Sequence, residues 1–201
     1  PYVYLFFTYD PPELLADDTT PRVSRLIRVQ ADAAKDYNVA LSGSIEVILG
    51  KNSTAQNTAF RLAVGATIIP EPASCMTGLT MDGTAIEDCL PSDELSHSAG
   101  TLIFGSDGYL YASHGDGASY NGASKVSLRS QMLDSLSGKV LRIDPNTGQG
   151  VLGNPFYDPA APGSNRSRIW SLGMRNPFRI TVNQATGQVY QGVVGPSSRE
   201  E

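Results

Sequence analysis

The segment TLIFGSDGYLYAS, residues 101–113, restricts the fold of this chain more than any other feature. Two short apolar runs flank a Gly-Ser-Asp-Gly turn, and an Asp-Gly pair between apolar runs is the strongest short-range signal for a β-hairpin. The chain also carries 20 glycines and 13 prolines in 201 residues. This density of turn formers suits short strands and disfavours a helical bundle. The sequence therefore predicts an all-β fold.

Further runs of apolar and β-branched residues predict strands along the rest of the chain. The runs are PYVYLFFTY (1–9), RVSRLIRVQ (22–30), SIEVIL (44–49), ATIIP (66–70), KVLRID (139–144), RIWSL (168–172), FRITV (178–182) and QVYQGVV (188–194). A single helical turn is expected within 51–65, and another near 128–133.

The hairpin region is echoed once along the sequence, 78 to 80 positions later. The matched positions are Leu102-x-Phe104, Tyr111 and Gly115 in the first copy and Ile180-x-Val182, Tyr190 and Gly195 in the second. That spacing is nearly two periods of a repeat of about 40 to 45 residues, or one period with a long insertion. Such repeats predict four-stranded antiparallel propeller blades, with a β-sandwich as the alternative.

Charge and hydropathy exclude several classes of partner. The net charge is -5 and the isoelectric point is near 5.0, so no basic surface is expected and nucleic acid is not a predicted partner. No window approaches eighteen consecutive apolar residues, so no membrane span is expected. PYVYLFF lacks the flanks of a signal peptide and alternates like a strand. The start at Pro1 and the ending SSREE favour a processed protein or a piece of a longer one.

Two cysteines and two sequons point to an exported protein. Thirteen residues separate Cys75 from Cys89, and a bridge between them would stabilise the fold by roughly 3 kcal/mol. The alternative is two reduced thiols, and zinc is not expected because neither histidine stands at ligand spacing. The sequons at Asn52 and Asn165 are glycosylation signals. We therefore expect a disulfide, glycosylation, and a secreted, extracellular or periplasmic location.

Five segments occur in an order that carries a family resemblance. They are SHSAGTLIFGSDGYLYASHGDG (96–117), SLSGKVLRID (135–144), GNPF (153–156), WSLGMRNPFRITV (170–182) and VVGPSSREE (193–201). Together they resemble the glucose/sorbosone dehydrogenase family, the soluble quinoprotein sugar dehydrogenases and their relatives. The resemblance is close over 95–201, loose over 1–50 and absent over 51–95.

The resemblance implies a six-bladed β-propeller. A blade takes about 40 to 45 residues, so 201 residues supply at most about four blades, and residues 1–201 are expected to be a partial propeller. We expect an early blade in 1–50, a long loop or insertion with the disulfide in 51–95, and the best-matching blades in 96–201. The remaining blades or a neighbouring chain would cover the open sheet edges.

The resemblance also implies a chemistry, pyrroloquinoline quinone-dependent oxidation of an aldose or similar polyol. His97, at the start of the H-S-x-G segment, would take the proton of the sugar anomeric hydroxyl, a task that suits a neutral imidazole. Arg175 would stabilise negative charge on the quinone, with Asn176 as a polar neighbour. The main-chain carbonyls of Gly195 and Pro196 would hold Ca²⁺, which prefers hard oxygen ligands.

These residues also have structural interpretations. His97 could cap a turn, and Arg175 could anchor a loop through carbonyl groups. Gly115-Asp116-Gly117 and residues 144–148 are expected to be turns rather than metal loops, and His114 a surface or satisfied histidine.

The chain departs from the family pattern in two ways. The acid of the family's G-D-V-G segment is replaced by Val193, and the later Lys and Arg residues that grip the quinone would lie beyond 201. The alternative function is a non-catalytic extracellular propeller that binds a protein or glycan, as in the hedgehog-interacting relatives, or a structural module of an extracellular assembly. No paired carboxylates favour a carbohydrate-cleaving enzyme.

Overall fold

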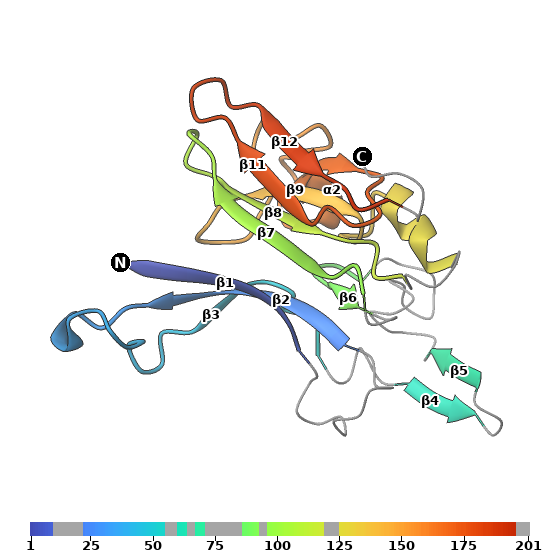
Figure 1. Cartoon of the computed structure of the whole chain (residues 1–201), viewed down its shortest axis with the longest axis horizontal. Helices are drawn as coiled ribbons and strands as arrows, with labels where there is room; N and C mark the ends of the chain where they lie inside the picture. The colour runs from blue at the N-terminus through green and yellow to red at the C-terminus, as the bar shows by residue number, and fades with distance from the viewer. Residues whose placement is uncertain are drawn as a thin grey trace.

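The computed structural model describes residues 1–9, 22–54, 60–63, 67–70, 86–92, 96–118 and 125–195. These residues form two four-stranded antiparallel sheets and two separate hairpins (Figure 1). The helices in the described part of the chain are short: the 3₁₀ helices η1 (Ala33–Lys35) and η2 (Lys125–Gln131), and α2 (Asn165–Arg168). The predicted all-β fold with four-stranded antiparallel sheets is confirmed.

The first sheet contains β1 (Tyr2–Tyr9), β2 (Arg22–Gln30), β3 (Glu46–Leu49) and β6 (Pro91–Ser92). β1 pairs with β2 along the whole length of β1, and β3 and β6 both pair with β2. β6 was not predicted, because two residues are too few to show a strand period. It joins the end of the 51–95 stretch to the first sheet.

A small hairpin of β4 (Phe60–Ala63) and β5 (Thr67–Pro70) also lies in the 51–95 stretch. The strand predicted at 66–70 is confirmed by β5. The helical turn expected in 51–65 does not occur in the described residues 51–54 and 60–63, and the latter form a strand instead.

The second sheet has the order β10-β9-β8-β7 and contains the predicted hairpin. β7 (Ala99–Phe104) and β8 (Leu110–His114) pair antiparallel, and Gly108 in the turn between them has a φ of +78°. β9 (Lys139–Ile143) and β10 (Ile169–Leu172) complete the sheet. The echo of the hairpin is β11 (Arg179–Val182) with β12 (Val189–Gly192), which pair in the same antiparallel way.

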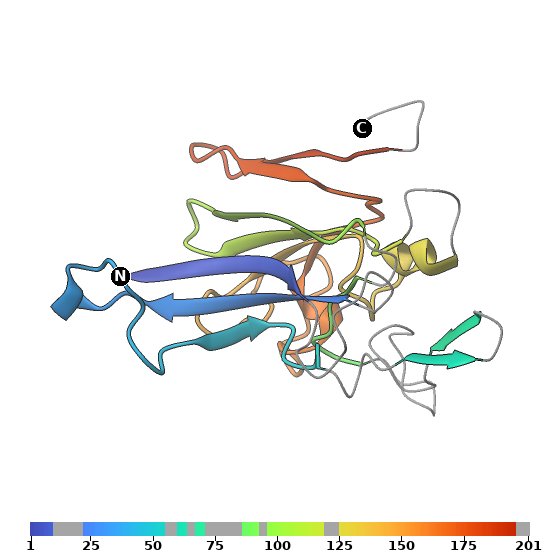
Figure 2. The ribbon, with the colours of Figure 1, turned by 60° about the horizontal axis from the view of Figure 1, so that its bottom comes forward.

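The sheets are stacked in layers. Figure 2 shows the green strands β7 and β8 between the blue strands β1 and β2 and the red β11–β12 hairpin, and β7 contacts both β1 and β11. Side chains alternate between the two faces of a strand, so β8 can serve two cores. Leu110 and Ala112 face the first sheet, whereas Tyr111 faces the β11–β12 hairpin.

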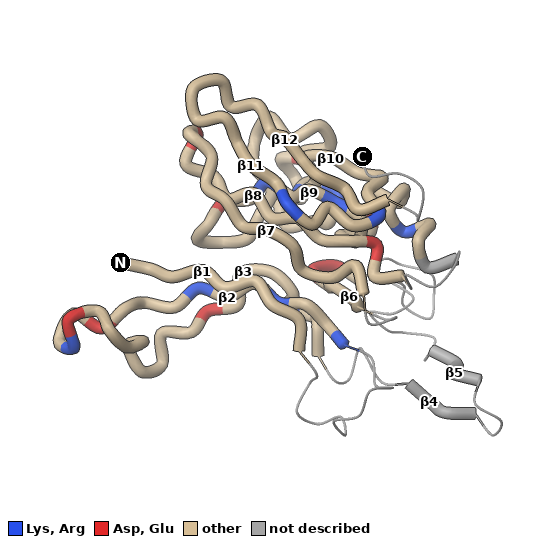
Figure 3. Tube along the Cα trace, in the orientation of Figure 1, with Lys and Arg blue, Asp and Glu red and all other residues tan. Residues whose placement is uncertain are grey.

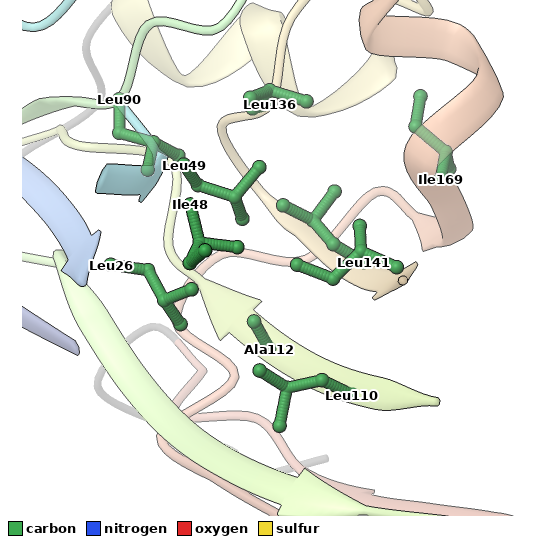
Figure 4. Close-up of a cluster of buried hydrophobic side chains, with 10 residues drawn as sticks. Leu26, Ile48, Leu49, Leu90, Leu110, Ala112, Leu136, Leu141 and Ile169 are labelled. Carbon is green, nitrogen blue, oxygen red and sulfur yellow. The ribbon is translucent and has the colours of Figure 1, made fainter. Parts of the chain in front are cut away.

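The larger core lies between the two four-stranded sheets (Figure 4). Its buried members are Leu26, Ile48, Leu49, Leu90, Leu110, Ala112, Leu136, Leu141, Ile143 and Ile169. Burying one such leucine or isoleucine contributes about 1.5 to 3 kcal/mol. The smaller core on the other face of the second sheet contains Tyr111, Val140, Ile180 and Val182.

Charged residues do not gather in one place. Acidic and basic positions are interspersed along the described trace, as Figure 3 shows. In that part of the chain, none of the helices has the length and apolar character that crossing a membrane requires.

A polar seam of Thr8, Ser24, Ser92 and His114 joins the two sheets. The Ser24 hydroxyl lies 3.0 Å from Thr8 Oγ1, 3.1 Å from Ser92 Oγ and 3.1 Å from His114 Nε2. His114 Nδ1 lies 2.8 Å from the carbonyl oxygen of Gly115, which can only accept. The neutral ring therefore donates from Nδ1 and accepts at Nε2. His114 is a buried histidine whose hydrogen bonds are satisfied, as expected.

The seam makes stability depend on pH. Burial lowers the pKa of His114 to about 4 from an ordinary value near 6.5. As the pH falls from 6.5 to 4, the unfolded chain binds this proton and the folded protein does not, so the contribution of His114 to stability falls by up to about 3 kcal/mol. Urea unfolding of the intact protein at pH 7 and pH 4.5 measures this loss. The slope of stability against pH should flatten in His114→Asn, and equal slopes in the two proteins would contradict the prediction.

Candidate functional site

The backbone around His97 is tightly constrained. His97 lies just before β7, is 6% exposed, and has a φ of +52°. A residue other than glycine held in that region costs about 1 to 3 kcal/mol, and such residues cluster at functional sites. The His97 carbonyl accepts a hydrogen bond of 3.1 Å from the N–H of Gly117. A Cβ at Gly115 would overlap this same carbonyl, so glycine lets the end of β8 lie against His97.

The hairpin register brings His97 opposite Asp116. Ala99 pairs with His114. His97 lies two positions before Ala99 and Asp116 two positions after His114, so these two residues meet across the hairpin. His97 Nδ1 lies 2.7 Å from Asp116 Oδ1, and both side chains are almost completely buried. Asp116 Oδ1 also accepts a hydrogen bond of 2.9 Å from the N–H of Ala118, which fixes the carboxylate.

This contact sets the tautomer of His97. An ionised carboxylate can only accept, so Nδ1 is the ring nitrogen that donates to it, and in a neutral ring the lone pair is then on Nε2. Nε2 has no hydrogen-bond partner among the described residues. The pair therefore has the hydrogen-bonding arrangement of a histidine base held by a carboxylate, within an almost completely buried site.

Sequence reasoning missed Asp116, which it treated only as part of a Gly-Asp-Gly turn. The structure assigns no turn to 115–117; the N–H groups of Gly115 and Gly117 instead donate to the carbonyls of Ser98 and His97, and the Asp116 carboxylate is the partner of His97. The signal that could have found it is the predicted hairpin itself, because antiparallel pairing places the start of one strand beside the end of the next.

The segment after β10 completes the site. The carbonyl of Arg175 accepts a hydrogen bond of 2.8 Å from the N–H of Asp116. The Arg175 guanidinium donates from Nη1 to the carbonyls of Val194, at 3.0 Å, and Gly195, at 3.1 Å. The carbonyl of Asn176 accepts from the N–H of Val194 at 2.9 Å. His97, Arg175, Asn176 and Gly195 thus belong to one network, and Pro196 lies outside the described residues.

The described residues do not by themselves fit a Ca²⁺ site. Ca²⁺ takes six to eight oxygen ligands. The carbonyl of Gly195 is a suitable donor, but it faces the Arg175 guanidinium. Val193 places a buried apolar side chain where the family pattern has an acid. The described part of the chain also holds no group of three or more His, Cys, Asp or Glu that could bind a metal.

The two sequons differ in accessibility. Asn52 is exposed, and glycosylation there stays a prediction. Asn165 is 1% exposed, and its side-chain nitrogen donates to the carbonyls of Ile86 at 3.2 Å and Asp134 at 2.8 Å. A glycan would replace one of the two amide hydrogens and so remove one of these bonds, and the nitrogen is buried, so the geometry argues against the predicted attachment at Asn165.

The predicted disulfide joins a described cysteine to one outside the described residues. Cys89 is buried, whereas Cys75 is not described. The bridge between them stays a prediction.

Comparison with known proteins identifies the family. The model of the family described as Glucose / Sorbosone dehydrogenase matches residues 77–201, which is more than half of the chain. This chain belongs to the glucose/sorbosone dehydrogenase family. The predicted family resemblance and β-propeller fold are confirmed. The match includes His97, Asp116, Arg175, Asn176 and Gly195, so the whole network lies in the family region.

Three curated relatives match with lower coverage. The HIPL2 protein of Arabidopsis thaliana is 38% identical over 100 residues, which are 44% of this chain and 14% of that protein. The HIPL1 protein of the same plant is 34% identical over 119 residues, 53% of this chain and 17% of that protein. The aldose sugar dehydrogenase YliI of Escherichia coli K12 is 32% identical over 108 residues, 53% of this chain and 26% of that protein. The chain thus spans at most about a quarter of these relatives' length.

The close approach of Gly115 to His97 gives a direct test of the site's backbone. Gly115→Ala places a methyl group against a backbone carbonyl that cannot move aside, and we expect a loss of about 1 to 3 kcal/mol of stability or more. Urea unfolding measures the loss. Gly163→Ala is the matched control, because a Cβ there meets nothing within 4 Å. Equal stability of the two variants would show that the approach is looser than the structure indicates.

Proposed function

We propose that this chain is part of a quinone-dependent dehydrogenase that oxidises an aldose or similar polyol, with His97 as general base. The observation that carries the proposal is the 2.7 Å contact between His97 Nδ1 and Asp116, which engages Nδ1 and no other ring nitrogen. Membership of the glucose/sorbosone dehydrogenase family and the name of the aldose sugar dehydrogenase YliI support the substrate class.

In the proposed reaction, Nε2 of His97 takes the proton of the sugar hydroxyl as the carbon that bears it loses a hydride. When bound, pyrroloquinoline quinone supplies the hydride acceptor. Asp116 holds the tautomer that makes Nε2 basic, and its negative charge stabilises the imidazolium that forms. Burial of both side chains strengthens this interaction because water screens it less.

Arg175 and Asn176 are the residues that would hold the quinone in this chain. The guanidinium of Arg175 carries a permanent positive charge, which would stabilise negative charge on a quinone oxygen. The main-chain carbonyl of Arg175 accepts a hydrogen bond from the N–H of Asp116. The segment that carries the guanidinium is therefore joined to the segment that carries the partner of His97. A Ca²⁺ ion at Gly195 and Pro196 would need further oxygen ligands from outside the described residues.

We also propose that the protein is exported. No cysteine of the described chain is a free thiol, which supports a bridge between Cys89 and Cys75. The exposed sequon at Asn52 fits the same location.

A non-catalytic propeller that binds a protein or glycan is the second candidate. The observation that favours it is the use of the Arg175 guanidinium to anchor the carbonyls of Val194 and Gly195. The apolar side chain of Val193 and the similarity to the two HIPL proteins fit this function as well.

Variants of the His97–Asp116 pair test the proposed reaction. The intact protein is incubated with pyrroloquinoline quinone and Ca²⁺, and dye reduction is followed with a panel of aldoses. His97→Gln should lower kcat by about 10² to 10⁴-fold, because the general base is lost. Asp116→Asn should lower it by about 10²-fold or more, because an amide does not hold the tautomer.

Asp144→Asn is the control, since Asp144 is an acid that caps an exposed turn at Asn146 and Thr147. Its kcat should stay that of the unaltered protein. Full activity of His97→Gln would refute the mechanism. A protein that neither binds the quinone nor oxidises any sugar would favour the binding function instead.

A further inference from the structure

Lys139 is a fully buried cation at the start of the central strand β9. A buried charge is costly unless its hydrogen bonds are satisfied. The Lys139 ammonium donates to the carbonyl oxygens of Arg129 at 3.0 Å, Ser130 at 2.9 Å and Ser137 at 2.7 Å. These bonds use all three donors of an ammonium group. One side chain thus gathers three carbonyls of the segment 129–138, which we call the backing segment.

The backing segment is bonded to both halves of the candidate site. The N–H of Gly138 donates to the carbonyl of Gly115 at 2.8 Å, and the carbonyl of Gly138 accepts from the N–H of Met174 at 3.1 Å. The carbonyl of Ser130, already bound by the ammonium, also accepts from the N–H of Gly173 at 2.9 Å. Gly115 directly precedes the aspartate of the site, and Gly173 and Met174 directly precede its arginine.

A further contact reaches Asp116 itself. Arg129, whose carbonyl is bound by Lys139, donates from Nη2 to the carbonyl of Asp116 at 3.3 Å. The backing segment has little room to shift. Gly138 has a φ of +66°, and a Cβ there would lie 2.6 Å from the carbonyl oxygen of Met174.

We propose that Lys139 is a positioning residue, whose ammonium fixes the backing segment and thereby holds Asp116 and Arg175 in their mutual arrangement. Lys139 contacts neither of these two side chains and acts through the backbone. The effect of Lys139 on catalysis rests on the proposed function. Its effect on the order of the backbone can be measured separately.

Burying Lys139 beside another cation disfavours its charged form. Burial and the neighbouring charge of Arg129 lower the pKa of Lys139 to about 7. The three carbonyl oxygens offset that cost by binding the ammonium. An apolar side chain of the same length would avoid the cost but would leave all three carbonyls without this donor.

The test compares Lys139→Met with Arg142→Met in the intact protein. Methionine keeps an unbranched chain and removes the charge and the donors. Arg142 is the matched control, because it is a second buried cation on β9 with partners elsewhere, at Asp107, Leu152 and Asn154. Lys139→Gln, which keeps two donors, serves in place of Lys139→Met if the latter does not fold.

The first readout is hydrogen exchange of the Asp116 amide, which donates to the carbonyl of Arg175. Relative to the slowest amides of β2, its protection should fall at least about tenfold further in Lys139→Met than in Arg142→Met. Equal protection in the two variants would overturn the proposal, whether or not the protein oxidises sugars.

The second readout is kinetic. Displacing catalytic groups by about 1 Å can cost about 10²-fold in rate, so kcat should fall by that order in Lys139→Met with KM changed less than about threefold. Arg142→Met should keep its kcat. A fall in kcat that is the same for both variants would reduce Lys139 to a general contributor to stability. Inactivity of the unaltered protein would refute the proposed function, and the exchange readout would still decide the role of Lys139.

Discussion

The antiparallel pairing of β7 with β8 is the contact on which both the core and the site depend. Its register places Ala99 opposite His114, so His97 and Asp116 meet at one end of the hairpin and the tight turn lies at the other. Beyond a register shift between Ala99 and Leu102, the same hairpin sends Leu110 and Ala112 into the larger core and Tyr111 into the smaller one. A slip of one residue would exchange the two faces of β8 and separate the imidazole from its carboxylate. Packing on both sides of the sheet therefore also specifies the geometry of the site.

Most of the fold could be predicted because its strands carry strong local signals. The alternation in 22–30 and the Asp-Gly turn after 101–104 led to β2 and to the β7–β8 hairpin at nearly their observed bounds. The helical turn expected near 128–133 is found as the 3₁₀ helix η2, which begins three residues earlier and ends at Gln131. β6 could not be predicted, because its two residues become a strand only by pairing with β2, which is distant in sequence.

The site was harder to predict because its contacts are not local. His97 and Arg175 were found through the family resemblance, and no pattern in their own neighbourhood indicates that Asp116 links them. Asp116 was overlooked because flanking glycines are equally typical of a simple turn. The Asn165 sequon illustrates the opposite error, since a three-residue motif carries no information about burial, and this asparagine is 1% exposed.

The carbonyl of Gly115 shows how the sheets and the site are joined. It accepts one hydrogen bond from His114 Nδ1 and another from the N–H of Gly138, each of 2.8 Å. The first bond belongs to the polar seam with the first sheet, and the second belongs to the segment fixed by Lys139. Each bond depends on a buried titratable side chain, His114 in the first case and Lys139 in the second. Burying such a group lowers the stability of the fold relative to an apolar side chain in the same place. These two buried side chains both act on the position of Gly115, the residue before Asp116. Two satisfied polar contacts define the position of a carboxylate more sharply than apolar packing could, because hydrogen bonds are directional whereas hydrophobic contacts are not.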